Sequence, residues 1–201
     1  MDLSEVLRRR RMVRHFDGRP IDPAAVERIV AAGLRAPSAG FAQGYALLML
    51  TEEADRQMFW DATAIDQTAA SWSPTTRAGV GRAPVVAVTL SCKRAYLDRY
   101  AREDKGWTDR DEARWTVPYW HVDTGMVALL MLLAAVDEGL GALFMGMAPE
   151  AVPRFRAAFG VPEDHDVVGV VCIGHEAADA PRRDLRSRRL AVDDVVHRGR
   201  W

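Results

Sequence analysis

Arginines gather at two places in the chain where an anion could bind. The first cluster follows a short predicted helix and contains Arg10, Arg11 and Arg14. The second lies near the C-terminus and contains Arg186 and Arg188, which would share one side of an extended segment. A guanidinium presents paired N–H donors that match phosphate oxygens, so both clusters together could hold one dianion. A solvated helix face and a disordered basic tail are the alternatives that need no ligand.

A stretch of small residues between a predicted helix and a predicted strand could lie against a flat ligand. It contains Pro37, Ser38 and Ala39 and continues to Gln43. Small residues let the backbone approach a ring closely, and Ser38 and Gln43 offer polar groups. The alternative is an ordinary connection between helix and strand.

A second such stretch follows the longest predicted helix, which ends at Gly139. Backbone peptide groups are left without helical partners where a helix ends, and small residues alternate there with apolar ones. A ring system could lie against the residues that follow, namely Leu143, Phe144, Met145 and Gly146. A helix C-cap followed by a core strand is the alternative.

These segments, in this order, resemble the nitroreductase family of FMN-dependent oxidoreductases. The family pattern has Arg-Arg-Ser-[Ile/Val]-Arg-x-Phe near the N-terminus and then Ala-Pro-Ser-x-x-Asn-x-Gln-Pro-Trp. A helix ending in Gly-[Leu/Ile]-Gly follows, and a Lys/Arg-x-Arg-x-Pro-like element lies close to the C-terminus. The corresponding segments of this chain are residues 10–16, 36–45, 139–141 and 186–188. The resemblance therefore covers almost the whole chain.

The resemblance implies an α+β fold with a central, mainly antiparallel sheet flanked by helices. It also implies an intertwined homodimer with two FMN sites at the subunit interface. The arginines at 10, 11, 14, 186 and 188 would then contact the phosphate and ribityl chain, with Met12 beside them. Pro37, Ser38, Ala39 and Gln43 would meet the isoalloxazine from the other subunit, and residues 143–146 would line the ring near its reactive edge.

Three positions depart from the family pattern. Met12 stands where the family has Ser, Phe41 replaces Asn, and Gly44-Tyr45 replaces Pro-Trp. The form Pro-Ser-x-Gly-Phe-x-Gln resembles the branch that includes the flavin-fragmenting enzymes of cobalamin-ligand synthesis, but that branch carries Asp where Met12 stands. In the loop 71–82, Arg77 or Arg82 would replace the Asn/Lys flavin contacts of the family.

The activity that the resemblance implies is flavin-dependent oxidation and reduction. Bound FMN would accept a hydride from NADH or NADPH and reduce a nitroaromatic, quinone or enone in a ping-pong cycle. The chain would need no dedicated acid or base for this chemistry. A biosynthetic dehydrogenase or reductase, and a flavin-binding protein without turnover, are the alternatives.

Predicted helices and strands place these segments. Apolar periodicity and helix-start signals predict helices over residues 3–11, 24–35, 52–62, 120–138 and 149–159. Continuous apolar runs predict buried strands over residues 45–50, 83–90 and 167–173, with a short apolar segment at 142–147.

We expect a loop over 66–82, a surface excursion or lid over 98–118 and an extended tail over 177–201 that reaches the segment 192–196. Trp107, Trp115 and the segment 118–121 could form an aromatic wall over the flavin or half-buried packing.

Composition limits the classes of protein that remain. The chain has 201 residues, with 27 Lys and Arg against 28 Asp and Glu, so we expect one domain over 1–201 and no nucleic-acid partner. We also expect no signal peptide, no membrane segment and a cytoplasmic location. Cys92 and Cys172 suit small buried side chains. His121 and Asp123 lie two apart on a helix, so we interpret them as a polar helix start and expect no metal site.

Overall fold

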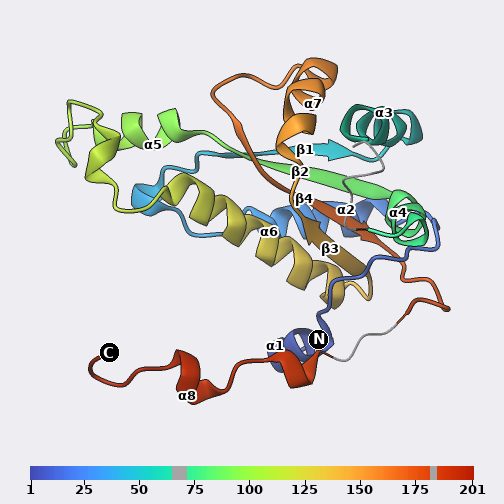
Figure 1. The fold of residues 1–201 in the computed structure, drawn as a ribbon. Coiled ribbons are helices and arrows are strands. Elements are labelled where there is room, and N and C mark those ends of the chain that lie inside the picture. Colours follow the sequence, from blue (N-terminus) through green and yellow to red (C-terminus); the bar gives the residue numbers. More distant parts are fainter. Residues whose placement is uncertain (65–71, 182–184) are drawn as a thin grey trace.

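A four-stranded sheet forms the centre of the computed structural model, which describes residues 1–64, 72–181 and 185–201 (Figure 1). The strands are β1 (Tyr45–Leu50), β2 (Val85–Ser91), β3 (Gly141–Met145) and β4 (Asp166–Gly174). Their order in the sheet is β1-β2-β4-β3, and every neighbouring pair is antiparallel. The expected α+β fold with a mainly antiparallel sheet is therefore confirmed. Every residue of β2 is buried, as its continuous apolar sequence predicts for a central strand.

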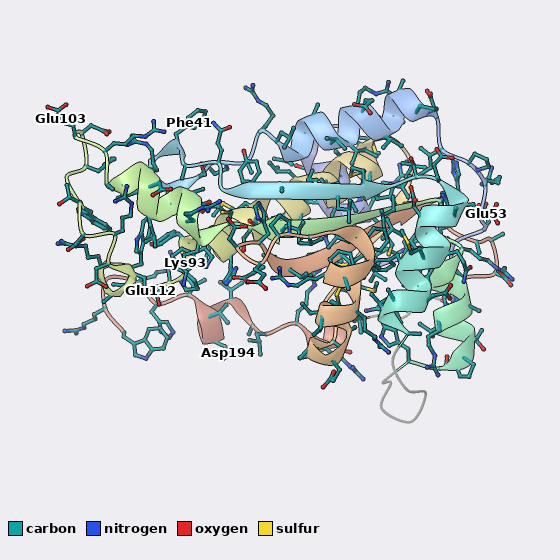
Figure 2. All side chains as sticks on the ribbon, turned by 90° about the horizontal axis from the view of Figure 1, so that it is seen from above. Phe41, Glu53, Lys93, Glu103, Glu112 and Asp194 are labelled. Carbon is teal, nitrogen blue, oxygen red and sulfur yellow. The ribbon has the colours of Figure 1, made fainter. Side chains whose placement is uncertain are left out.

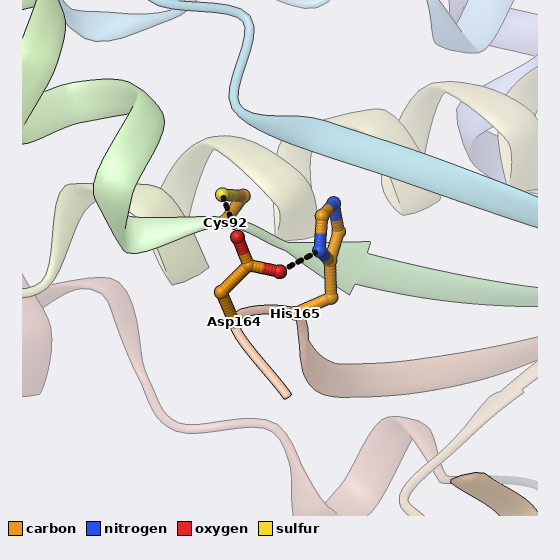
Figure 3. Close-up of side chains that lie close together, drawn as sticks. All are labelled: Cys92, Asp164 and His165. Carbon is orange, nitrogen blue, oxygen red and sulfur yellow. Dashed lines mark hydrogen bonds and ion pairs between the residues drawn. The ribbon is translucent and has the colours of Figure 1, made fainter. Parts of the chain in front are cut away.

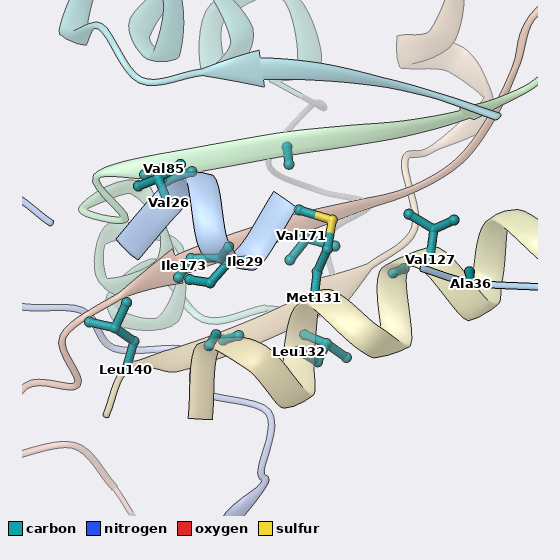
Figure 4. Packing of buried hydrophobic residues seen from close by; sticks show 14 residues of the cluster. Val26, Ile29, Ala36, Val85, Val127, Met131, Leu132, Leu140, Val171 and Ile173 are labelled. Carbon is teal, nitrogen blue, oxygen red and sulfur yellow. The ribbon is translucent and has the colours of Figure 1, made fainter. Parts of the chain in front are cut away.

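Helices cover both faces of this sheet (Figure 1). One face carries α2 (Pro23–Gly33) and α6 (Tyr119–Asp137), which pack on each other. Their side chains meet the sheet in a dry cluster that includes Ile29, Met131 and Ile173 (Figure 4). The other face carries α3 (Glu53–Thr63), α4 (Pro74–Gly81) and α7 (Val152–Phe159). Fully buried apolar side chains therefore fill the space on each side of the strands.

The remaining helices lie toward the edges of this core. They are α1 (Leu3–Arg9), α5 (Lys93–Tyr100) and α8 (Val192–Val195), with 3₁₀ turns η1 (Ala39–Phe41), η2 (Glu112–Arg114), η3 (Pro149–Ala151) and η4 (Arg186–Arg188). Both termini lie below the sheet in the view of Figure 1.

Helix α6 is long and apolar enough to cross a membrane when judged by its sequence alone. Half of that stretch is buried inside the protein, however, and α6 contacts α2 and all four strands of the sheet. Its apolar surface therefore serves as part of the core.

Two expectations about local structure are wrong. The segment expected as a loop over 66–82 contains α4, because Ser73 caps its first turn and Pro74 occupies the first helical position; residues 65–71 lie outside the described part. The tail is not extended throughout, since its backbone turns at η4. The expected shared side for Arg186 and Arg188 assumed an extended backbone, whereas residues 186–188 form a 3₁₀ turn.

Candidate functional site

The N-terminal segment that carries the first arginine cluster runs along the edge of β3. Met12 forms a parallel bridge with Ala142, and the Val13 N–H donates to the Ala142 carbonyl at 2.9 Å. The contact is close, because a Cβ on Gly141 would lie 2.8 Å from the Val13 side chain. Val13 and Phe16 are buried and anchor the segment. The N-terminal cluster and the strand predicted to line a ring are thereby joined within one chain.

The arginines of this segment differ in their partners. Arg11 forms an ion pair with Glu176, in which Nε lies 3.1 Å from Oε1. The Arg14 guanidinium donates to the carbonyl of Met12 at 3.3 Å and lies in solvent. No ion pair involves Arg10 or Arg14 within the described residues. Of the three predicted arginine contacts, Arg10 and Arg14 therefore have no carboxylate partner in the part of the chain that the structure describes.

Solvent exposure increases along the last residues of β3. Leu143 is fully buried among the residues packed on the α7 face, so only its backbone could contact a ligand. Phe144 and Met145 are half-buried, and Gly146 is exposed with nothing within 4 Å of the position of an added Cβ. The Phe144 N–H points toward the sulfur of Met12 at 3.4 Å. The open end of β3 thus lies beside the segment that carries the N-terminal arginines.

The loop 37–44 has an unusual backbone. Gly40, Phe41 and Gln43 all have positive φ angles, of 59°, 56° and 49°. This region favours glycine and is uncommon for residues with a side chain. The Ser38 hydroxyl accepts the Gln43 N–H at 3.0 Å and closes the turn. The side chain of Phe41 stands out from the loop with 76% of its surface exposed (Figure 2).

Helix α5 supports this loop from one side. The Arg99 guanidinium donates to the Gly40 carbonyl at 2.7 Å. A Cβ on Gly40 would lie 2.6 Å from the Tyr100 ring, and one on Gly44 would lie 2.5 Å from the Tyr96 ring. The departure from Pro to Gly at position 44 therefore has a physical reason, because the Tyr96 ring leaves no room for a larger residue.

A buried carboxylate supports the loop from α6. Asp123 is 3% exposed, and its Oδ2 accepts the Ala39 N–H and the Tyr96 hydroxyl, each at 2.8 Å. Burial and this bond to the carboxylate raise the pKa of Tyr96, so its hydroxyl stays protonated and donating. Asp123 does lie in the first turns of α6, as the interpretation of a polar helix start has it, but its side chain is buried. An Asp inside an otherwise apolar helix was the sequence signal for this role.

The excursion over 98–118 begins inside α5 and then folds onto aromatic side chains. The rings of Trp107 and Trp115 lie 4.9 and 4.5 Å from that of Tyr100. Trp115 also contacts Tyr96 and Trp120 edge-on. Both Trp107 and Trp115 are half-buried, which favours the packing alternative over an open aromatic wall.

Three potential metal ligands meet where β2 ends: Cys92, Asp164 and His165 (Figure 3). The Asp164 carboxylate already accepts His165 Nδ1 at 2.8 Å and pairs with the Arg94 guanidinium at 2.5 Å. These two contacts hold the pKa of Asp164 below its ordinary value. Because Arg94 supplies the compensating charge, we interpret the cluster as a link between β2, α5 and the segment before β4.

A serine, a histidine and an aspartate from distant parts of the chain also lie in a row at this end of the sheet. Ser91 Oγ and His121 Nδ1 are hydrogen-bonded at 2.8 Å, and His121 Nε2 lies 3.9 Å from Asp166. Ser91 is fully buried, so its hydroxyl cannot meet a substrate. Cys172 is equally inaccessible, and burial raises its pKa to about 12, so its thiol is unreactive at neutral pH.

The C-terminal arginines Arg186 and Arg188 are the first and last residues of η4. Arg188 is exposed on η4, and no interaction joins it to Arg10 or Arg14 in the part of the chain that the structure describes. Arg77 lies on α4 and Arg82 caps its C-terminus. That the two arginine clusters hold one anion together stays a prediction.

Comparisons with known proteins agree with this geometry. The model of the Nitroreductase family matches residues 7–175. A 5,6-dimethylbenzimidazole synthase from Rhodobacter capsulatus is 33% identical over 183 residues, covering 86% of this chain and 82% of the relative. A nitroreductase family protein from Streptococcus pneumoniae TIGR4 matches with a TM-score of 0.73 at 17% identity, covering 98% of this chain and 99% of that one. A nitroreductase-like protein from Exiguobacterium sibiricum 255-15, solved with FMN, matches with a TM-score of 0.72 at 19% identity, covering 98% and 97%.

The structural matches establish the shared fold, and the family model extends over most of the sequence, including the first arginine cluster and the open end of β3. This chain is a member of the nitroreductase family.

Proposed function

We propose that this protein is an FMN-dependent oxidoreductase that takes its electrons from NADH or NADPH. The observation that carries the proposal is the pairing of residues 12–13 with β3. It sets the segment that carries Arg10 and Arg14, which have no carboxylate partner among the described residues, along the edge of β3. A phosphate needs uncompensated guanidinium groups, and a ring needs a small, open backbone such as that at Gly146. The chain's own residues thus fit FMN.

The proposed site is shared between two subunits. Arg10, Arg11 and Arg14 would hold the phosphate and ribityl chain, with Arg11 also bound to Glu176. The loop residues Pro37, Ser38, Ala39 and Gln43 would approach the ring from the partner subunit, and Arg186 and Arg188 would complete the phosphate site. The FMN complex of a protein with this fold supports the choice of cofactor.

When bound, FMN would supply the hydride and electron transfer in a ping-pong cycle. The chain itself would bind the phosphate, orient the ring along residues 143–146 and leave one face open to a flat acceptor. Such an acceptor would be a nitroaromatic, a quinone or an enone. No side chain is assigned as an acid or base, and we place the enzyme in the cytoplasm.

The test is an absorbance spectrum of the purified protein, followed by anaerobic titration with NADH and with NADPH. We expect a yellow protein with one FMN per subunit that bleaches with at least one donor and recovers its colour with a quinone. A yellow protein that neither donor bleaches would indicate flavin binding without turnover. A colourless protein that does not take up added FMN would contradict the proposal.

A biosynthetic role is the second candidate, since the Rhodobacter capsulatus relative is described as a 5,6-dimethylbenzimidazole synthase. Met12 stands where that branch carries Asp, so the chain lacks a carboxylate at this position. Aerobic incubation with reduced FMN and mass spectrometry for a benzimidazole product tests this candidate. Product from the unaltered chain would replace the first proposal. Product only from a Met12→Asp variant would show that this position decides the chemistry.

A further inference from the structure

A buried charge lies next to the loop that the proposed function places against the flavin ring. Asp123 is the one charged side chain among the buried residues of the described part of the chain. Burying a carboxylate is costly unless hydrogen bonds offset the lost hydration. One of its oxygens accepts two bonds, from Ala39 N–H and from the Tyr96 hydroxyl. An apolar residue would pack in α6 without this cost, so the carboxylate serves a purpose beyond packing.

That purpose lies in the shape of the loop. The positive φ angles at Gly40, Phe41 and Gln43 make the loop costly to hold, and such a backbone persists only where its surroundings fix it. The bond from Ala39 to Asp123 fixes the loop just before this stretch. Arg99 fixes it from the other side through the Gly40 carbonyl. The carboxylate therefore ties the strained loop to the central helix of the core.

We propose that Asp123 is a positioning residue for the flavin contact made by Pro37, Ser38 and Ala39. This inference rests on the proposed function, because it concerns the same loop. The carboxylate holds the Ala39 N–H inward, so Ala39 meets the ring through its methyl group or carbonyl and not through its amide. The bond also sets the place from which the Ser38 side chain can reach the ligand.

Thr124 provides a matched control for this role. It is the next residue of α6 and is fully buried. Its hydroxyl donates a hydrogen bond to the Trp120 carbonyl of its own helix at 2.7 Å. Thr124→Val removes a buried hydrogen bond without touching the loop. Asp123→Leu removes the acceptor and keeps the branched shape and number of side-chain heavy atoms, and Asp123→Asn keeps an oxygen that can accept both bonds. Asp123→Ala serves the same purpose if the leucine prevents folding.

The experiment compares these full-length variants by amide hydrogen exchange over residues 38–44, by FMN dissociation constant and by visible circular dichroism of the bound flavin. We expect Asp123→Leu to speed exchange in the loop, weaken FMN binding roughly tenfold or more and alter the flavin dichroism. Asp123→Asn should restore most of each signal. Thr124→Val should lower the melting temperature and leave all three signals unchanged.

Two outcomes would overturn the inference, and they separate it from the proposed function. If the unaltered protein binds FMN while Asp123→Leu keeps the affinity, dichroism and exchange of that protein, the positioning role is wrong and the proposed function stands. If Thr124→Val changes the same signals equally, Asp123 acts only through general stability. A protein that binds no FMN would overturn the proposed function and this inference with it.

Discussion

Single residues at this site show how one side chain can decide what its neighbours do. Glu176 forms an ion pair with Arg11, whereas Arg10 and Arg14 have no carboxylate partner among the described residues. At position 44 the Tyr96 ring admits only glycine, which explains why this chain lacks the proline of the family pattern. Charge compensation and close contact, and not residue type alone, therefore define which positions are available to a ligand.

The first prediction concerns the phosphate site. Arg10→Ala combined with Arg188→Ala should strip FMN from the protein during purification. Each lost charge-assisted hydrogen bond costs about 1.5–3 kcal/mol, so the pair should raise the FMN dissociation constant roughly 100-fold or more. The measurement is the ratio of flavin to protein absorbance, followed by titration with free FMN.

The control for this prediction removes the same charge one or two positions away. Arg8→Ala combined with Arg189→Ala alters two exposed arginines, of which Arg8 pairs with Glu5. This variant should keep its flavin. Stoichiometric flavin in the Arg10/Arg188 variant would refute the assignment of these residues to the phosphate.

Sequence patterning missed two of the helices, α4 and α5, and α4 shows why. A segment rich in Ser, Thr and Gly resembles a loop, yet Ser73 and Pro74 begin a helix there and Val80 ends up fully buried. The helix also holds the N-terminal segment, because the Gly79 carbonyl accepts the Phe16 N–H at 3.1 Å. A short helix with few apolar residues thus fixes the segment that follows the arginine cluster.

The second prediction tests this helix start. Ser73 Oγ accepts the Thr76 N–H at 3.2 Å, and loss of such a cap costs about 1 kcal/mol. Ser73→Ala should therefore lower the free energy of unfolding by about this amount in urea denaturation. Thr75→Ala, at an exposed position of the same helix, should be neutral or slightly stabilising. Equal stability of the two variants would argue against the cap.

At the scale of the whole molecule, the tail stands out because it has little to pack on. Leu190 and Val195 are 72% and 54% exposed, and Trp201 is 99% exposed with its ring tilted against that of His197. Apolar side chains in such a segment are costly in water unless a second surface covers them. We propose that the partner subunit of a homodimer provides this surface, which would also bring Arg188 to the arginine cluster of the other chain.

The third prediction follows from this proposal. A chain that lacks residues 182–201 should elute as a monomer and bind little FMN, while its far-ultraviolet circular dichroism stays that of a folded protein. Leu190→Ser combined with Val195→Ser should weaken the dimer in the same direction. Arg198→Ser combined with Arg200→Ser is the matched control and should leave the dimer intact. An unchanged dimer in the truncated chain, measured by light scattering, would contradict the embracing tail.

The amino-acid sequence by itself determined the fold class and most element positions. Continuous apolar runs and helix-start signals such as Asp22-Pro23 are local, so their structural consequences can be read without knowing the partners. The motifs at residues 10–16, 36–45 and 139–141 likewise identified the family, and the order of these motifs indicated where a flavin would bind.

Only the tertiary structure decided which of those residues remain available and what holds them. The partner of Arg11 lies 165 positions away, and the bond between Ala39 and Asp123 spans 84 positions. No local pattern encodes such a contact, because it forms only when the sheet brings distant segments together. Asp123 illustrates this limit: its type and position were visible in the sequence, but its burial beside a strained loop arises from packing alone.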